Sequence, residues 1–240
     1  RQSIDAMGRQ QEAYPYNDPT SLPIQPTFGQ DGAWLKIPLA LPGRTLYLRV
    51  WQAIVGRTSL YLLDSNDLLN GASDRGITSK LYGGGSEMRL LQEVVLGIGG
   101  WATLEALAIN VDVCHLNEGH AALLVLERAR RFMHQKGTSF QEAWWATRAG
   151  NVFTTHTPVA AGFDVFSAEL VLKYARGYLD DCRLTSHELL ALGRRNPSDA
   201  DEPFNMAFLA LRGCAHGLRG ISSGLGQAPD AFGPARVCAR

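Results

Sequence analysis

The sequence predicts an α/β fold in which a parallel sheet carries an antiparallel extension. Strand-like segments at residues 111–116 and 151–155 are each followed by helical patterns, as in the βαβ units of parallel sheets. Three further strand-like segments between residues 34 and 63 follow one another without a helix, which indicates an antiparallel meander. With 240 residues, 45% of them hydrophobic, the chain can form one large domain or two small ones.

The meander is the first regular feature of the chain. Residues 1–31 are polar and rich in proline, and we expect a surface connection with little regular structure there. Apolar and polar residues then alternate at 34–39, 45–55 and 59–63. Turns are predicted at Pro42 and Gly43 and again at Gly56 and Arg57, so consecutive strands pair as hairpins.

A polar loop and a glycine-containing helix follow the meander. Residues 64–85 are rich in Ser, Asn, Asp and Gly, and long polar loops in compact domains are often functional. Apolar residues recur at helical spacing from Ser86, the predicted N-cap. Gly97, Gly99 and Ala102 fit the dinucleotide fingerprint G-x-G-x-x-A. Because the apolar spacing around them is helical, we expect these glycines to allow close packing of a buried helix instead.

Amphipathic helices dominate the second half of the chain. One is predicted from about His120 to Gln135, with apolar residues on one face and a polar, mostly charged face opposite, which includes Glu127, Arg128, Arg130 and Arg131. Capping boxes predict helix starts at Ser139 and Thr185. Further helices are expected at 167–176 and 204–211. From residue 213 to residue 240 no period is sustained, and no regular structure is predicted.

The composition excludes several classes of partner. The formal net charge is zero, so nothing favours nucleic acid or an anionic membrane surface. No apolar run approaches the ~20 residues of a membrane span, and the first residues lack the apolar core of a signal peptide. Four widely spaced cysteines predict free thiols in the cytoplasm, without a disulfide framework or a zinc cluster. The chain lacks an initiator Met, which is typical of a fragment or a processed product.

Two strand ends carry the candidate site. The segment VDVCHLNEGH ends in Asn117, Glu118 and His120, and TTHTP places His156 and Thr157 after the next strand. Because parallel strands end at one edge of a sheet, we expect His120 and His156 to face the same crevice. The alternative is that these imidazoles and hydroxyls satisfy turn backbones, and the spacing does not decide between the two.

The polar groups favour one chemistry among several. HLNEGH departs from H-E-x-x-H, which disfavours a metal site formed with His115, and we expect His115 to be a hydrogen-bonded core residue. No G-x-S-x-G elbow is present. A glycosidase site with a pair of carboxylates remains an open alternative, with Glu118 and Asp164 near strand ends. Asn, Glu, His and Thr together suit a polyhydroxylated ligand, whose hydroxyls both donate and accept hydrogen bonds. His134 and His187 are expected on solvated helix faces.

Five ordered segments carry a family resemblance. They are YLLDSNDLLNGASDRGITSKLYGG, EMRLLQEVVLGIGG, DVCHLNEGHAALLVLER, VFTTHTPVAAGFDVF and FNMAFLALR. Together they resemble the α-glucan phosphorylases, in particular the shorter bacterial and archaeal type of glycogen phosphorylase. The likeness extends over residues 1 to about 212.

The resemblance implies a glycosyltransferase-B fold, with an active site between two Rossmann-like domains. Residues 1–212 would form the later part of the N-terminal domain. The implied reaction is phosphorolysis of a terminal α-1,4-linked glucose by inorganic phosphate, giving α-glucose 1-phosphate with retention. The family uses pyridoxal phosphate, and none of the four lysines here matches its cofactor motif. The resemblance further implies a cytoplasmic enzyme of a family with allosteric members, and it is compatible with a homo-oligomer.

The resemblance also assigns site residues. His156 and Thr157 match the glucosyl subsite, where the family's equivalent histidine hydrogen-bonds the sugar. Asn117, Glu118 and His120 lie beside it and are expected in the catalytic site.

A second group of residues matches the family's gating loop. Arg89 and Glu93 would lie under this loop, and Tyr82 within it, with Arg89 and Tyr82 contacting substrate. The shorter family type usually has an acid after the paired glycines of this loop. Gly85 and Ser86 stand there in this sequence, which is a departure.

Two larger departures concern what the chain lacks. The family's glycine-rich element and its whole C-terminal domain, with the cofactor lysine, have no counterpart here. We therefore expect the isolated chain to be inactive in phosphorolysis. Residues 213–240 leave the family pattern, as a frameshift would produce, and an alternate reading frame of the coding DNA should then restore it.

Two alternatives remain at this stage. A nucleotide-sugar glycogen or starch synthase also places polar turns after its strands, although such an enzyme favours an HxHDWH-like turn where this chain has HLNEGH. A non-catalytic glucan-binding module is the other alternative.

Overall fold

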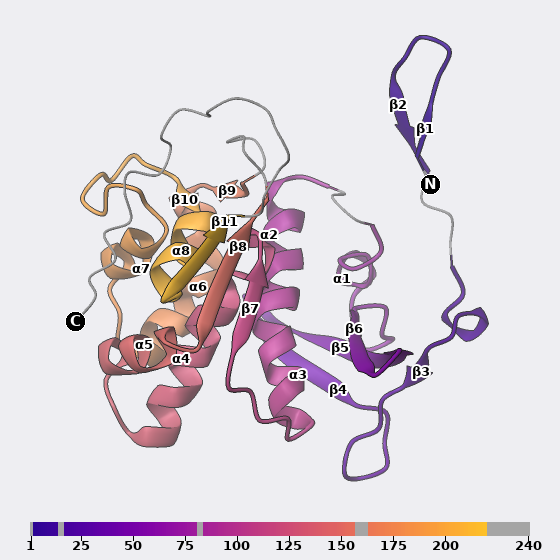
Figure 1. Cartoon of the computed structure of the whole chain (residues 1–240), viewed down its shortest axis with the longest axis horizontal. Helices are drawn as coiled ribbons and strands as arrows, with labels where there is room; N and C mark the ends of the chain where they lie inside the picture. Colours follow the sequence, from indigo (N-terminus) through magenta and orange to yellow (C-terminus); the bar gives the residue numbers. More distant parts are fainter. Residues whose placement is uncertain (1, 14–16, 81–83, 157–162, 220–240) are drawn as a thin grey trace. The chain divides into compact units, whose positions relative to one another are not determined.

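The computed structural model confirms an α/β chain with a three-stranded parallel sheet and separate antiparallel sheets (Figure 1). It describes residues 2–13, 17–80, 84–156 and 163–219. The chain divides into two compact units, residues 1–110 and 111–240. Each unit has one main sheet and one separate two-stranded pair, and each unit is described by itself.

The long strand β5 (Arg44–Val55) organises the first unit. It pairs antiparallel with β4 (Lys36–Leu41) along its first half, with β6 (Thr58–Asp64) along its second half, and with the short β3 (Gln25–Pro26). Gly43 and Gly56 adopt φ values of 71° and 62°, which a residue with a side chain rarely adopts. The predicted meander and both of its turns are confirmed.

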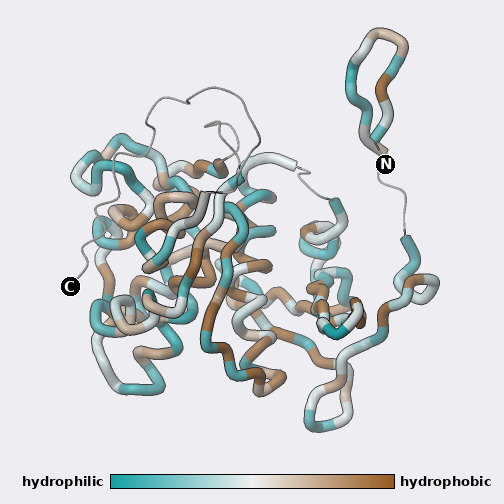
Figure 2. The backbone as a smooth tube through the Cα atoms, viewed as in Figure 1, coloured by the Kyte–Doolittle hydropathy of each residue, from teal (hydrophilic) through white to brown (hydrophobic). Residues whose placement is uncertain are grey.

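A short hairpin at the N-terminus differs from the prediction. Strands β1 (Gln2–Ile4) and β2 (Gln10–Glu12) pair antiparallel, and a 3-10 turn, η1 (Pro19–Ser21), follows. The Asp5 carboxylate closes the hairpin by accepting the backbone N–H groups of Met7 and Arg9, each at 2.9 Å. The hairpin is exposed and mostly hydrophilic (Figure 2), so no apolar alternation could reveal it.

One helical rod packs on the meander. It consists of α2 (Ser86–Val94), the π-helical turn η2 (Val95–Gly99) and α3 (Gly100–Ala106). Gly97 and Gly99 therefore lie in a buried helix, as predicted. A Cβ on Gly99 would lie 2.8 Å from Leu48 Cδ1 and 3.3 Å from Leu39 Cδ1, so the glycine allows the backbone to approach the sheet. Ser86 is the first helical residue, and Gly85 occupies the cap position without a side-chain bond, which corrects the predicted N-cap.

The second unit is built on three parallel strands. The strand order is β11-β8-β7, with β7 (Cys114–Asn117), β8 (Asn151–Thr155) and β11 (His216–Arg219). Leu116 and Phe153 are almost fully buried on one face of the sheet. The expectation of no regular structure after residue 212 is wrong for β11, because a four-residue strand containing a glycine is too short to show a period. Residues 220–240 lie outside the described residues.

The helices of this unit follow the predicted order with shifted ends. They are η3 (Gly119–Ala121), α4 (Leu123–Lys136), α5 (Phe140–Arg148), α6 (Ala168–Cys182), α7 (Ser186–Leu192) and α8 (Met206–Gly213). Both capping boxes are present, and a short antiparallel pair joins β9 (Val165–Phe166) to β10 (Phe204–Asn205). Helix α6 continues past Gly177 to Cys182, because nothing at that exposed position requires a break.

One charged residue of α4 contradicts the amphipathic pattern. Glu127 was expected on the solvated face, yet its side chain is fully buried. Arg130 and Arg131 surround its carboxylate with bonds of 2.7 to 2.9 Å. A buried carboxylate is stable only when paired in this way, and the pairing is invisible to a two-class pattern of apolar and polar residues.

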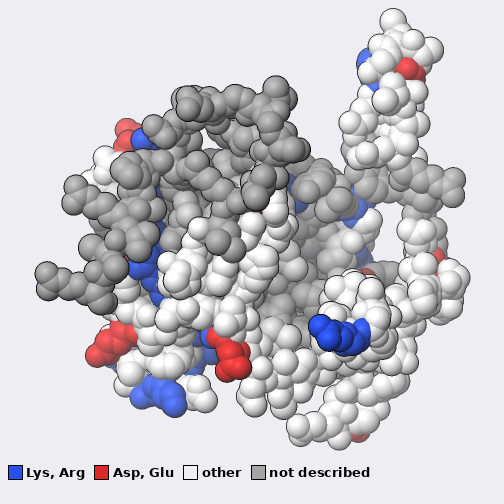
Figure 3. Space-filling model, in the orientation of Figure 1, with Lys and Arg blue, Asp and Glu red and all other residues white. Residues whose placement is uncertain are grey.

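Charged side chains are scattered on the face shown in Figure 3, with blue and red groups among white ones. This distribution agrees with the balance of 23 basic and 23 acidic residues. Within the described part of the chain, no helix combines the length and the apolarity that a membrane crossing requires.

Substitution of Gly99 tests the packing of the rod on the meander. The variant Gly99→Ala should be destabilised by about 1–3 kcal/mol through overpacking, partly offset by up to about 1 kcal/mol of helix propensity. Gly100→Ala is the matched control, because Gly100 is also helical and a Cβ there meets nothing within 4 Å. The control should be slightly stabilised. Urea unfolding midpoints measure both, and equal stabilisation of the two variants would contradict the packing argument.

Candidate functional site

The carboxyl ends of β7 and β8 meet at one edge of the parallel sheet. Asn117, the last residue of β7, pairs with Thr154, and β8 ends one residue later. The backbone N–H of Glu118 continues the ladder by donating to the Thr154 carbonyl at 2.8 Å. The polar groups that follow each strand are therefore brought together, as parallel pairing predicts.

Asn117 and His156 form the exposed part of this edge. The Asn117 Oδ1 and His156 Nε2 atoms lie 3.1 Å apart, and both residues are exposed to solvent. Because an amide oxygen only accepts hydrogen bonds, Nε2 carries the proton in this arrangement. In the neutral imidazole, the second ring nitrogen, Nδ1, is then an acceptor.

Glu118 lies behind this pair and is 7% exposed. Its Oε1 accepts the backbone N–H of His156 at 2.6 Å, and its Oε2 accepts the Thr155 hydroxyl at 3.0 Å. Its backbone has a φ of 59°, an uncommon conformation for a residue with a side chain. The carboxylate thus bonds to the end of β8 from the end of β7.

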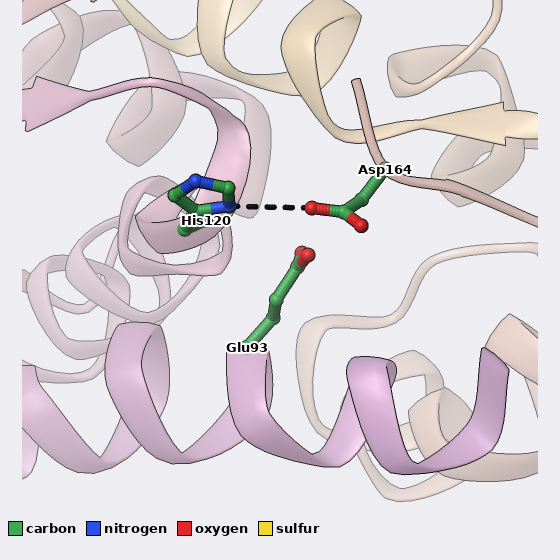
Figure 4. A group of neighbouring side chains, drawn as sticks. All are labelled: Glu93, His120 and Asp164. Carbon is green, nitrogen blue, oxygen red and sulfur yellow. Dashed lines mark hydrogen bonds and ion pairs between the residues drawn. The ribbon is translucent and has the colours of Figure 1, made fainter. Parts of the chain in front are cut away.

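His120 belongs to a second polar pair. Its Nδ1 lies 3.2 Å from Asp164 Oδ2 (Figure 4), while the Asp164 carbonyl accepts the Met206 N–H at 3.1 Å. The turn packs closely here, since a Cβ on Gly119 would lie 3.1 Å from the Met206 Cβ. A crevice shared by His120 and His156 stays a prediction. Glu93, also drawn in Figure 4, belongs to the first unit.

Arg89 and Glu93 lie one turn apart on α2, with 3.6 Å between Arg89 Nη2 and Glu93 Oε1. Arg89 Nη1 also donates to Gln92 Oε1 at 3.2 Å. Gln92 in turn donates to the carbonyls of Ile77 and Lys80, at 2.9 and 2.8 Å. The sequence did not predict these Gln92 contacts, which join α2 to the end of the preceding loop. Tyr82 and Thr157 lie outside the described residues.

The polar loop before α2 is held by internal bonds. It contains one helical turn, α1 (Ala72–Arg75). The buried Asn70 side chain bonds the N–H and carbonyl of Tyr47 and the carbonyl of Ser65, at 2.7 to 2.8 Å. Asp74 accepts a bidentate pair from Arg44 at 2.6 and 2.9 Å. Much of the polarity that suggested a functional loop therefore serves its own folding.

The remaining histidines separate into surface and edge positions. His134 and His187 are exposed on their helices, as predicted. His115 is hydrogen-bonded, with Nε2 2.7 Å from Thr154 Oγ1, but it is exposed and not part of the core. The reason is that burial alternates along β7, so His115 lies on the exposed face of the strand while Cys114 and Leu116 are buried. The two imidazoles of HLNEGH thus bond different partners, Thr154 and Asp164.

The three described cysteines are free and buried. Burial raises the pKa of the Cys182 and Cys214 thiols to about 12, and it also raises the pKa of Cys114. The thiolate is the nucleophilic form, so at neutral pH these cysteines are poor nucleophiles.

This burial predicts slow alkylation of the native protein. In a Cys238→Ser variant, iodoacetamide at pH 8 should leave Cys114, Cys182 and Cys214 unmodified while the chain is folded. In urea all three thiols should react, because unfolding lowers their pKa values and exposes the sulfur atoms. Peptide mass spectrometry measures the modification, and rapid labelling of any of the three in the native state would contradict the structure.

Phosphorylases from several organisms are similar to this chain. No family model matches the chain. The maltodextrin phosphorylase of Thermococcus litoralis is 39% identical over 212 residues, covering 88% of this chain and 24% of that protein. The glycogen phosphorylase of Mycobacterium tuberculosis is 38% identical, covering 92% and 27%. The glycogen phosphorylase of Aquifex aeolicus is 31% identical, covering 88% and 30%.

The chain thus matches these relatives over most of its own length and spans only 24% to 30% of theirs. The resemblance seen in the five ordered segments is confirmed by these matches. The chain belongs to the α-glucan phosphorylase family, as a segment equivalent to about a quarter of its relatives.

Proposed function

We propose that this chain supplies part of the glucose-binding wall of an α-glucan phosphorylase. The full reaction would be phosphorolysis of a terminal α-1,4-linked glucose to α-glucose 1-phosphate, with retention. The observation that carries the proposal is the exposed Asn117–His156 pair at the carboxyl ends of two parallel strands, in a chain whose relatives are named as phosphorylases. Residues 1–212 would belong to the N-terminal domain of a glycosyltransferase-B fold.

The chemistry of the pair suits a sugar. A hydroxyl of glucose can donate to His156 Nδ1, because the ring's other nitrogen is engaged with Asn117. The Asn117 side chain offers an amide N–H₂ group that can donate to a second hydroxyl. Sugars are bound through such donor and acceptor groups on rigid elements, and both residues adjoin strands of one sheet.

The family's pyridoxal phosphate does not fit the lysines that the structure describes. Lys36 is paired with Asp67 at 2.9 Å, and Lys173 lies over the Tyr174 ring at 5.4 Å. Lys80 and Lys136 are exposed. A cofactor lysine requires a desolvated position within a site, and none of these four has one. We therefore propose that this chain contributes residues that bind the sugar, and we assign it no step that involves the cofactor.

Binding of maltoheptaose to the purified 240-residue chain tests the proposal. Calorimetry should detect binding, and His156→Ala should weaken it about tenfold, the effect of about 1.4 kcal/mol from lost hydrogen bonds. His134→Ala is the control, because His134 is exposed on α4 and bonds to Asp181. Equal affinities of His156→Ala and the unsubstituted chain would count against the proposed site.

A second measurement separates binding from catalysis. With maltoheptaose and inorganic phosphate, the 240-residue chain should release no glucose 1-phosphate, because it corresponds to about a quarter of its relatives. An enzyme-coupled assay for glucose 1-phosphate measures this. Detectable release would show that this segment carries the whole catalytic centre.

A further inference from the structure

Glu118 joins the two strand ends that form the candidate site. Its Oε1 lies 2.6 Å from the His156 backbone nitrogen, and its Oε2 lies 3.0 Å from the Thr155 hydroxyl. Both acceptors of the carboxylate therefore face residues of β8 or its immediate continuation. With 7% of the residue exposed, the carboxylate is largely shielded from solvent.

The backbone at Glu118 is shaped to make these bonds. Its φ of 59° and ψ of −173° lie outside the conformations that side-chain-bearing residues usually adopt. Such conformations persist only where surrounding interactions hold them, and they cluster at functional sites. Here the N–H of Glu118 is bonded to the Thr154 carbonyl at 2.8 Å, and Gly119 is closely packed against Met206. The unusual φ value and the two carboxylate bonds thus occur in the same residue.

The consequence of this arrangement falls on His156. Asn117 bonds the imidazole at Nε2, while the adjacent Glu118 bonds the backbone nitrogen of the same residue. Two consecutive residues of one strand end therefore hold the ring and the main chain of one histidine. Ring orientation depends on both bonds, because a shift of the main chain would move Nε2 away from the Asn117 oxygen.

We infer that Glu118 is a positioning residue that acts through His156, and not an acid, a base or a nucleophile of the reaction. This inference rests on the proposed function, in which His156 contacts the sugar. The chemical requirement at position 118 is then an acceptor for the His156 N–H at the correct reach, and the negative charge is secondary. The substitution Glu118→Gln meets that requirement, since its amide oxygen can accept the N–H and its N–H₂ can donate to the Thr155 hydroxyl.

Glu118→Asp supplies the opposite test, because it keeps the charge and shortens the side chain by one methylene. The readout is the pair of ring ¹⁵N shifts of His156 in the 240-residue chain, which report which nitrogen carries the proton. The unsubstituted chain and Glu118→Gln should both show protonation mainly at Nε2. Glu118→Asp and Glu118→Ala should shift toward a mixture of the two tautomers, and maltoheptaose affinity should fall about tenfold in both.

Glu188 provides a matched control. Its Oε2 accepts the N–H and the hydroxyl of Thr185, each at 2.8 Å, so it makes the same kind of bonds at the start of α7. Glu188→Asp should leave the His156 shifts unchanged. Circular dichroism and urea midpoints establish whether each variant is folded. If Glu118→Ala does not fold, Glu118→Asp and Glu118→Gln still determine whether Glu118 positions His156.

Two outcomes would overturn the inference. One is a Glu118→Gln variant that behaves like Glu118→Asp, which would mean that the charge itself matters. The other is a set of variants whose His156 shifts all match the unsubstituted chain. If the unsubstituted chain does not bind maltoheptaose, the proposed function fails, while the ring shifts still determine whether Glu118 positions His156.

Discussion

The parallel pairing of β7 with β8 is the constraint on which the candidate site depends. It sets Asn117 opposite Thr154, so the residues after each strand emerge beside one another. The Glu118 carboxylate then bonds across the two strand ends. Without this register, Asn117 and His156 would be two unrelated polar side chains, 39 positions apart in the sequence.

The opposite end of the same sheet is fixed by a second set of polar bonds. Arg128 from α4 donates to the Asn151 side chain at 2.6 Å and to the Gly150 carbonyl at 2.8 Å. Asn151, which is buried, donates in turn to the Gly213 carbonyl at 2.8 Å, just before β11. The three strands are therefore linked near their amino ends through Arg128 and Asn151, while the Glu118 carboxylate joins the carboxyl ends of β7 and β8. A rigid sheet is what a site built on strand ends needs, because small displacements weaken oriented hydrogen bonds.

The first unit obtains its rigidity in a different way. Its sheet and helical rod meet through the close approach at Gly99, and its polar loop is held by buried side chains such as Asn70. Gln92 connects the helical rod to the polar loop, because its side chain on α2 donates to the carbonyls of Ile77 and Lys80. In each unit a buried asparagine side chain, Asn70 or Asn151, bonds to backbone atoms of a distant segment, which limits the conformations available to the segments it joins.

Local patterns determined much of this fold. Alternation predicted the meander, Gly43 and Gly56 predicted its turns, and the capping boxes at Ser139 and Thr185 predicted helix starts. The order of five segments identified the family, because such an order is far more specific than any one motif. These features are local or linear, so they can be recognised without knowing which segments touch.

Tertiary structure alone decided the rest. Glu127 is buried because two arginines neutralise it, β11 exists because β8 offers it an edge, and His115 is exposed because it lies on the exposed face of β7. The two oxygens of Glu118 find their partners at positions 155 and 156, which no local pattern connects to position 118. The sequence by itself determined which residue types stand at the strand ends and to which family the chain belongs. Only the pairing of distant strands decided which atoms bond, because hydrogen bonding depends on positions in space and not on separation along the chain.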